Sequence, residues 1–132
     1  MTQLFPFWRF PLINYVLRQK LYGTYLECEP QGGVIQTESD ALDLIAACGE
    51  NETSNLLIHA ENLPEAFYDL RTGFAGAILL KFSNYRLRVA AILDPVKSSR
   101  GRFGEMALET NRGNQFRIFP DVESAETWLL HP

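Results

Sequence analysis

A strand–helix–strand pattern between residues 55 and 93 constrains the fold of this chain more than any other feature. It reads NLLIHA, then the polar stretch ENLPEAFYDLRTG, then FAGAILLKFSNY, then RLRVAAIL. Two short apolar strands on either side of an amphipathic helix are typical of a parallel βαβ unit. The predicted buried face of the helix recurs with helical period and consists of Phe74, Ala75, Ile78, Leu79 and Phe82.

The polar corner at residues 68–73, just before this helix, is the first place where the sequence indicates a site. The start of a helix presents unpaired N–H groups and the positive end of the helix dipole, which favour anions. Asp69, Arg71 and Thr72 lie in this corner. Gly73 and Gly76 follow, although a glycine inside a helix costs about 1 kcal/mol relative to alanine. Their presence predicts that the helix approaches a strand closely.

The other elements are predicted from similar patterns. Residues 13–19 and 24–29 are rich in strand formers and are joined by a turn at Gly23, which predicts a β-hairpin. Thr37 is placed to cap the first helix, and Asp121 to cap the last one. Between them, the sequence also predicts a helix over residues 102–110 and a strand over residues 115–119.

This order of elements predicts an α/β fold. Alternating helices and strands build a mixed sheet that is mostly parallel, here with an N-terminal antiparallel hairpin and about four helices. A chain of 132 residues is long enough for one domain with a substantial core. We assign residues 12–132 to this single domain and residues 1–11 to a hydrophobic, aromatic N-terminal arm.

Composition excludes some classes of function. The formal net charge of -4 argues against nucleic-acid binding, because such proteins usually present a basic face. The basic side chains between residues 86 and 112 are interpreted as solvated ends of helices and strands. Neither Cys28 nor Cys48 has a partner at zinc-ligand spacing, so we expect no metal and no cofactor. Both are interpreted as small buried thiols in a reducing compartment.

The N-terminal stretch MTQLFPFWRFPLINYVL is apolar, but Pro6, Arg9 and Pro11 interrupt it. A signal peptide needs an unbroken apolar run before a cleavage site, and a membrane helix needs about 20 apolar residues. We therefore expect a cytoplasmic protein without a membrane anchor. The arm's aromatic side chains need a surface on which to bury, either this domain's own sheet edge or a second copy of the chain; they are Phe5, Phe7, Trp8 and Phe10.

The element order resembles the STAS domain, the fold of bacterial anti-sigma-factor antagonists and of the cytoplasmic tails of sulfate transporters. In that family a central strand ends near an Asp-Ser-Ser-Gly corner, and an apolar helix and strand follow. Here the corner reads FYDLRTG, and FRIFPDVESAETWLL is similar to the family's last strand and helix. The family's switch serine aligns with Leu70, and Thr72 offers the nearest aliphatic hydroxyl. The resemblance implies a STAS-like fold whose corner serves as a binding surface more than as a phosphorylation switch.

Three segments are similar to an uncharacterised bacterial family, domain of unknown function 4180. They are SDALDLIAACGE, LLIHAENLPEAFYDLRTGFAGAILLKFSNYR and GRFGEMALETNRGNQFRIF. This resemblance supports the fold and implies no activity.

The candidate site residues are chosen by their predicted position. Ligands of open α/β sheets gather at the carboxyl ends of the strands, and the corner before the second helix lies on the same side. The turn at residues 111–114 adds an arginine that can bind a carboxylate or phosphate. The resulting candidates for binding a ligand or partner are His59, Glu61, Asp69, Arg71, Thr72, Asp94 and Arg112.

These residues predict a non-catalytic regulatory or binding module that binds a protein partner or a small anionic ligand near the start of the second helix. One alternative is a small enzyme in which His59 acts as a general base with Glu61 or Asp69. Another alternative is a structural or oligomerisation module, in which the arm joins two copies of the chain into a homodimer. The sequence contains no G-x-S-x-G nucleophile motif and no phosphate-binding loop of the P-loop type.

Overall fold

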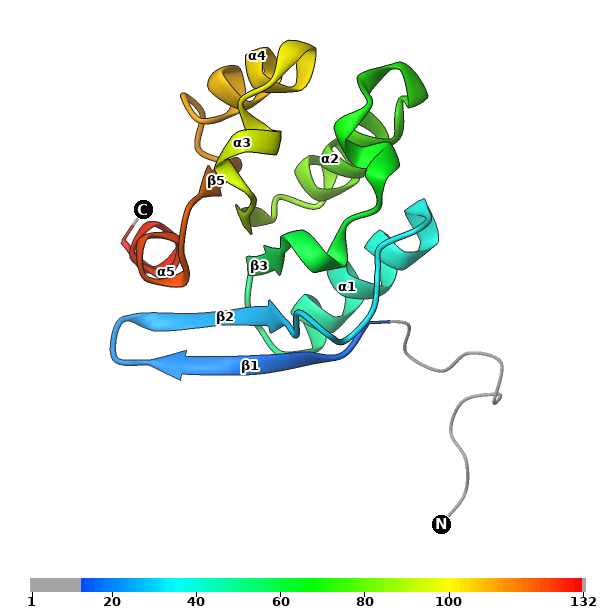
Figure 1. Cartoon of the computed structure of the whole chain (residues 1–132). Coiled ribbons are helices and arrows are strands. Elements are labelled where there is room, and N and C mark those ends of the chain that lie inside the picture. The colour runs from blue at the N-terminus through cyan, green and yellow to red at the C-terminus, as the bar shows by residue number, and fades with distance from the viewer. Residues whose placement is uncertain (1–12, 132) are drawn as a thin grey trace.

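The computed structural model describes residues 13–131 and contains one five-stranded sheet (Figure 1). The strands follow one another across the sheet in chain order. The first pair is antiparallel and the later pairs are parallel, which confirms the predicted mixed α/β sheet with its N-terminal hairpin. The strands are β1 (Tyr15–Lys20), β2 (Gly23–Cys28), β3 (Asn55–His59), β4 (Arg88–Ile92) and β5 (Phe116–Phe119).

Four longer helices and a one-turn helix connect and cover these strands. They are α1 (Glu38–Glu50), α2 (Phe74–Asn84), α3 (Pro95–Ser98), α4 (Gly101–Thr110) and α5 (Val122–Leu130). Both predicted caps are present: the Thr37 hydroxyl accepts a hydrogen bond from the Asp40 N–H at 3.1 Å, and the Asp121 carboxylate accepts one from the Ser124 N–H at 2.8 Å. No helix within residues 13–131 is both long and apolar enough to cross a membrane.

The two faces of the sheet are covered unequally. Each parallel crossover moves one strand further in the same direction, so right-handed connections place the crossover helices on one face. The main core forms there, between α1, α2 and α4 and the strand residues Leu26, Leu56, Ile58, Val89, Ala91 and Phe116. The other face carries a smaller core beneath α5, made of Tyr25, Leu57, Ala90, Ala125 and Leu129.

The glycines of α2 have a different role from the one predicted. Gly73 adopts a positive φ of 74°, which ends the preceding turn and starts the helix. Gly76 is exposed, and a Cβ added there would meet nothing within 4 Å. The expected close approach to a strand at these glycines is therefore wrong. The predicted apolar face of α2 is confirmed, with Ala75, Ile78 and Phe82 buried.

Candidate functional site

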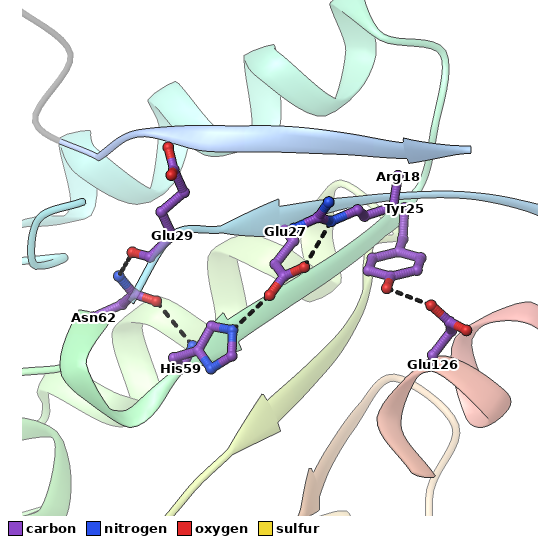
Figure 2. Close-up of polar contacts among 7 residues, drawn as sticks. All are labelled: Arg18, Tyr25, Glu27, Glu29, His59, Asn62 and Glu126. Carbon is purple, nitrogen blue, oxygen red and sulfur yellow. Dashed lines mark hydrogen bonds and ion pairs between the residues drawn. The ribbon is translucent and has the colours of Figure 1, made fainter. Parts of the chain in front are cut away.

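The segment between β3 and α2 forms an irregular corner of three 3₁₀ turns, which we call the corner. The turns are η2 (Ala60–Asn62), η3 (Glu65–Tyr68) and η4 (Leu70–Thr72). Asn62 is completely buried and fastens the beginning of the corner (Figure 2). Its Oδ1 accepts a hydrogen bond from the His59 N–H at 2.8 Å, and its Nδ2 donates to the carbonyls of Glu29 and Gly33, both at 2.9 Å. The end of β3 is thereby tied to the chain that follows β2.

Phe67 fastens the middle of the corner. Its ring is completely buried, with ring centroids 5.7 Å from Phe103 of α4 and 6.4 Å from Phe116 of β5. Its neighbour Tyr68 is partly exposed, with its ring centroid 5.0 Å from that of Phe103 and the Lys97 ammonium 4.7 Å from its own ring centroid. The aromatic rings of Phe67 and Tyr68 therefore attach the corner to the start of α4. The sequence alone did not predict this contact between the two segments.

The polar side chains of the corner are held by local hydrogen bonds. The Asp69 carboxylate accepts hydrogen bonds from the Arg71 side chain, with both N–O distances 3.0 Å, and from the Arg71 backbone N–H. These bonds lower the pKa of Asp69 below its ordinary value. The Thr72 hydroxyl is in hydrogen-bond contact with the carbonyls of Ala66 and Asp69 and accepts from the Phe74 N–H. The structure thus brings three predicted site residues together.

A cleft of about 480 Å³ opens between the corner and the beginning of α4. Arg100 and Arg102 are exposed and form no side-chain hydrogen bond or ion pair with any residue in the range 13–131. Arg71, which also lines the cleft, is exposed but paired with Asp69. Three guanidinium groups and one carboxylate give the cleft a net positive charge. Its lining comprises Tyr68, Asp69, Leu70, Arg71, Arg100, Gly101, Arg102 and Phe103.

His59 lies in a separate polar cluster on the α5 face of the sheet (Figure 2). Its Nε2 is hydrogen-bonded to Oε2 of Glu27 at 2.8 Å, and the Arg18 Nε donates to Oε1 of Glu27 at 2.9 Å. The side chains of His59 and Glu27 are each 12% exposed. The carboxylate partner of His59 is therefore Glu27, whereas Asp69 pairs with Arg71 and Glu61 is exposed.

Sequence reasoning missed Glu27 because it stands 32 residues from His59. The parallel pairing of β2 with β3, which places Glu27 beside Leu57, creates this contact. One feature of the sequence could have revealed Glu27: it is an acidic residue in a predicted strand, between the apolar residues Leu26 and Cys28. Both of these neighbours are completely buried in the structure. Such a carboxylate needs a partner, because an unpaired buried charge is costly.

The stability of the fold should fall as the solution is acidified through the folded-state pKa of Glu27. Burial alone would raise this pKa, but hydrogen bonds from His59 and Arg18, with their charges, lower it below the ordinary 4.5. A depressed pKa contributes stability that is present above the unfolded pKa and is lost as pH falls through the folded one. When the free energy of unfolding is measured with urea at about pH 7 and about pH 3, it should decrease less for Glu27→Gln than for the native chain. Identical losses would contradict this assignment.

The remaining predicted residues are placed apart from the cleft wall. Asp94 is exposed and caps α3, accepting a hydrogen bond from the Val96 N–H at 2.9 Å. Arg112 is exposed, with its guanidinium 3.8 Å from the Glu109 carboxylate. In the part of the chain that the structure describes, no three His, Cys, Asp or Glu side chains are grouped so that they could hold a metal ion.

Comparison with known proteins gives one match. The model of a protein family described as a domain of unknown function, DUF4180, matches residues 22–129. No curated protein and no solved structure matches the chain.

Proposed function

Because this chain belongs to the DUF4180 family, whose description names no activity, we propose its function from the site. The proposal is a non-catalytic binding module whose cleft, between the corner and α4, holds an anionic group of a protein partner or a small ligand. We also propose that the sheet and helices form a STAS-like domain. The order of the elements and the position of the corner support this second proposal, which does not depend on the first.

The observation that carries this proposal is a pair of exposed arginines, Arg100 and Arg102, that line the cleft together with the corner and have no side-chain partner within residues 13–131. A guanidinium is a planar fork of donors that matches a carboxylate or a phosphate with two hydrogen bonds. Arg71 adds a third cation, already oriented by Asp69. The contrast with the net charge of -4 for the whole chain makes this a local basic site on an acidic protein.

The contacts of Thr72 favour binding over a phosphorylation switch. Its hydroxyl is engaged with two backbone carbonyls and a backbone N–H, so it serves to shape the entry to α2. Leu70 stands where the resembled family carries its switch serine, and Leu70 is partly buried against the core. The proposed module therefore recognises its partner through charge and shape at a preformed surface.

A cytoplasmic location is part of the proposal. Cys28 and Cys48 are both buried and unpaired. Burial raises the pKa of the Cys48 thiol to about 12, so it stays protonated and unreactive at neutral pH. Free thiols of this kind suit a reducing compartment.

A second candidate function is an enzyme that uses His59 as a base. The specific observation in its favour is the Glu27 carboxylate, which orients the imidazole through Nε2, whereas the carboxylate of the serine-protease triad binds Nδ1. The two candidates are separable because His59 does not line the cleft. His59→Gln should leave anion binding at the cleft unchanged, whereas it would abolish a reaction that depends on this base.

Replacing Arg100 and Arg102 together with alanine should weaken anion binding at least tenfold. A hydrogen bond to a charged group contributes about 1.5–3 kcal/mol, and 1.4 kcal/mol corresponds to a factor of ten in affinity. The measurement is a backbone NMR titration with inorganic phosphate and, separately, acetate. In the native chain, we expect saturable shifts confined to the corner and the first turn of α4.

Arg112→Ala is the matched control, since it removes an exposed arginine that already has Glu109 nearby and does not line the cleft. It should leave the titration unchanged. Two results would overturn the proposal. One is a set of shifts that remains unchanged in the variant carrying both Arg100→Ala and Arg102→Ala. The other is an equal loss of the shifts in Arg112→Ala.

A further inference from the structure

The cleft between the corner and α4 is apolar as well as basic. Beside its charged side chains, its lining includes Tyr68 and Leu70 of the corner and Phe103 of α4. Tyr68 and Leu70 pack against the core but are only partly buried, so part of their apolar surface stays open to solvent. Both segments that line the cleft place an apolar residue directly beside an arginine, in the pairs Leu70–Arg71 and Arg102–Phe103.

We propose that the cleft binds an amphipathic anion, in which a phosphate or carboxylate is attached to an aromatic or other apolar group. This inference rests on the proposed function and adds the chemical class of the ligand. The guanidinium groups bind the charge, and the apolar surface of Tyr68 and Leu70 covers the attached group. A bare anion would use only the first of these contacts. Residues 1–11, the predicted arm, lie outside the described part of the chain, and the inference does not involve them.

The size of the cleft suits a ligand larger than a bare anion. Its volume of about 480 Å³ falls within the range of about 300–1,000 Å³ that is usual for small-molecule sites. Such sites combine a mainly apolar lining with a few polar groups that fix the orientation of the ligand. Apolar atoms likewise form the larger part of this cleft's surface, and the arginines provide the polar groups.

Tyr68 is held in place by contacts inside the domain. Its ring centroid lies 6.0 Å from that of Phe67, in an edge-to-face arrangement, and 5.0 Å from that of Phe103. The Lys97 ammonium, which forms an ion pair with Glu65, lies 4.7 Å from the Tyr68 ring centroid. A ring fixed by these neighbours offers its remaining surface to a ligand at little cost in side-chain entropy.

A second hollow on the molecule has the apolar lining without the charge. It is a groove of about 480 Å³ between α2 and the start of β5, lined in part by Leu79, Leu80 and Phe116. None of the described residues that line this groove is charged. The groove can therefore attract an apolar group but offers no cation for the anion attached to it. An amphipathic anion should prefer the cleft, where both kinds of contact are present.

The test compares ligands that share an anionic group and differ in the group attached to it. Phenyl phosphate is titrated against methyl phosphate, and benzoate against acetate, by backbone NMR on the full chain. In each pair we expect the phenyl compound to bind about tenfold more tightly, the gain that corresponds to roughly 60 Å² of apolar surface removed from water. Its shifts should include Tyr68, Leu70 and the first turn of α4.

Leu70→Ala tests whether the gain comes from the apolar wall of the cleft. The ratio of the affinities for phenyl phosphate and methyl phosphate should fall about threefold in this variant, because part of the apolar contact is removed. Leu80→Ala, which removes an exposed leucine from the groove, is the matched control and should leave the ratio unchanged. If Leu70→Ala fails to fold, nuclear Overhauser contacts between the phenyl protons and the Leu70 methyl groups of the native chain take its place.

A native chain that binds methyl phosphate and phenyl phosphate equally well would overturn the inference and leave the proposed anion site intact. Phenyl phosphate shifts confined to the groove would overturn it as well. If none of the four ligands causes saturable shifts, the proposed function fails and the inference fails with it.

Two sources could supply such a ligand, and a further arm of the experiment separates them. A short peptide in which phosphotyrosine stands between glycines is titrated beside phenyl phosphate. Tighter binding of the peptide identifies a side chain of a protein partner, whereas equal or weaker binding identifies a free small molecule. Both results support the inference, provided that the peptide or phenyl phosphate binds more tightly than methyl phosphate.

Discussion

Replacing Asn62 with leucine is expected to lower the free energy of unfolding by about 3 kcal/mol or more, because leucine fills a similar volume but makes none of the three hydrogen bonds. The His59 N–H and the carbonyls of Glu29 and Gly33 lose their partner. Each buried polar group left unsatisfied costs about 1–3 kcal/mol. The effect should therefore exceed that of an ordinary polar substitution.

Urea unfolding followed by circular dichroism measures this change. Asn84→Leu is the matched control, since Asn84 is exposed at the end of α2 and its side chain makes no hydrogen bond within residues 13–131. The control should stay within about 0.5 kcal/mol of the native chain. Equal stabilities for Asn62→Leu and Asn84→Leu would show that Asn62 does not fasten the corner.

Replacing Phe67 with alanine is expected to cost about 3–5 kcal/mol, the usual range for removing a fully buried phenylalanine ring. The loss includes the contacts with Phe103 and Phe116, which hold the corner against α4 and β5. The shape of the cleft should also change, because Phe67 anchors the wall that carries Asp69 and Arg71. Phosphate affinity should fall even under conditions in which the variant remains folded.

Phe67→Leu is the control for this second prediction. It retains most of the apolar volume, so it should cost clearly less than Phe67→Ala, and it should leave the cleft largely intact. The same urea unfolding and phosphate titration serve for both variants. A Phe67→Ala chain that is destabilised yet binds phosphate as well as the native chain would show that the corner does not position the cleft.

Together, Asn62 and Phe67 explain how an irregular segment holds the proposed binding residues Asp69 and Arg71 in place. The corner lacks the long runs of hydrogen bonds found in a helix or strand, so its shape depends strongly on its buried side chains, among them Asn62 and Phe67. A rigid support reduces the ordering cost of binding, which is the general advantage of a preorganised site. The exposed arginines can then meet a ligand without rearranging the backbone.

Local signals in the sequence predicted the elements of this fold well. Thr37 and Asp121 cap the helices they were expected to cap, and the hairpin has Gly23 at the end of its turn. These features depend on neighbours within a few residues, so a single sequence contains the information. Gly76 was misread because glycine in a helix indicates an unusual requirement but does not say which one.

The candidate site was predicted only in part, because some of its residues are close in the chain and others meet only in the folded structure. Asp69, Arg71 and Thr72 are close in the chain, and their contacts follow from the corner itself. Arg100 and Arg102 belong to the cleft because Phe67 and Phe103 pack together, and the spacing of charges does not reveal such a contact. The basic residues were visible in the sequence, but their common surface was not.

The sequence by itself determined the order of the strands and the four longer helices, the apolar face of α2, the caps of α1 and α5, and the corner before α2, whereas α3 and the 3₁₀ turns were not predicted. These follow from periodicity and short-range hydrogen bonding, which act along the chain. Only the tertiary structure decided that His59 pairs with Glu27, that Asn62 joins the ends of β2 and β3, and that Arg100 and Arg102, at the start of α4, line one cleft with the corner. Those contacts arise from strand register and side-chain packing between segments about 30 residues apart, where the physical interactions depend on the folded geometry as a whole.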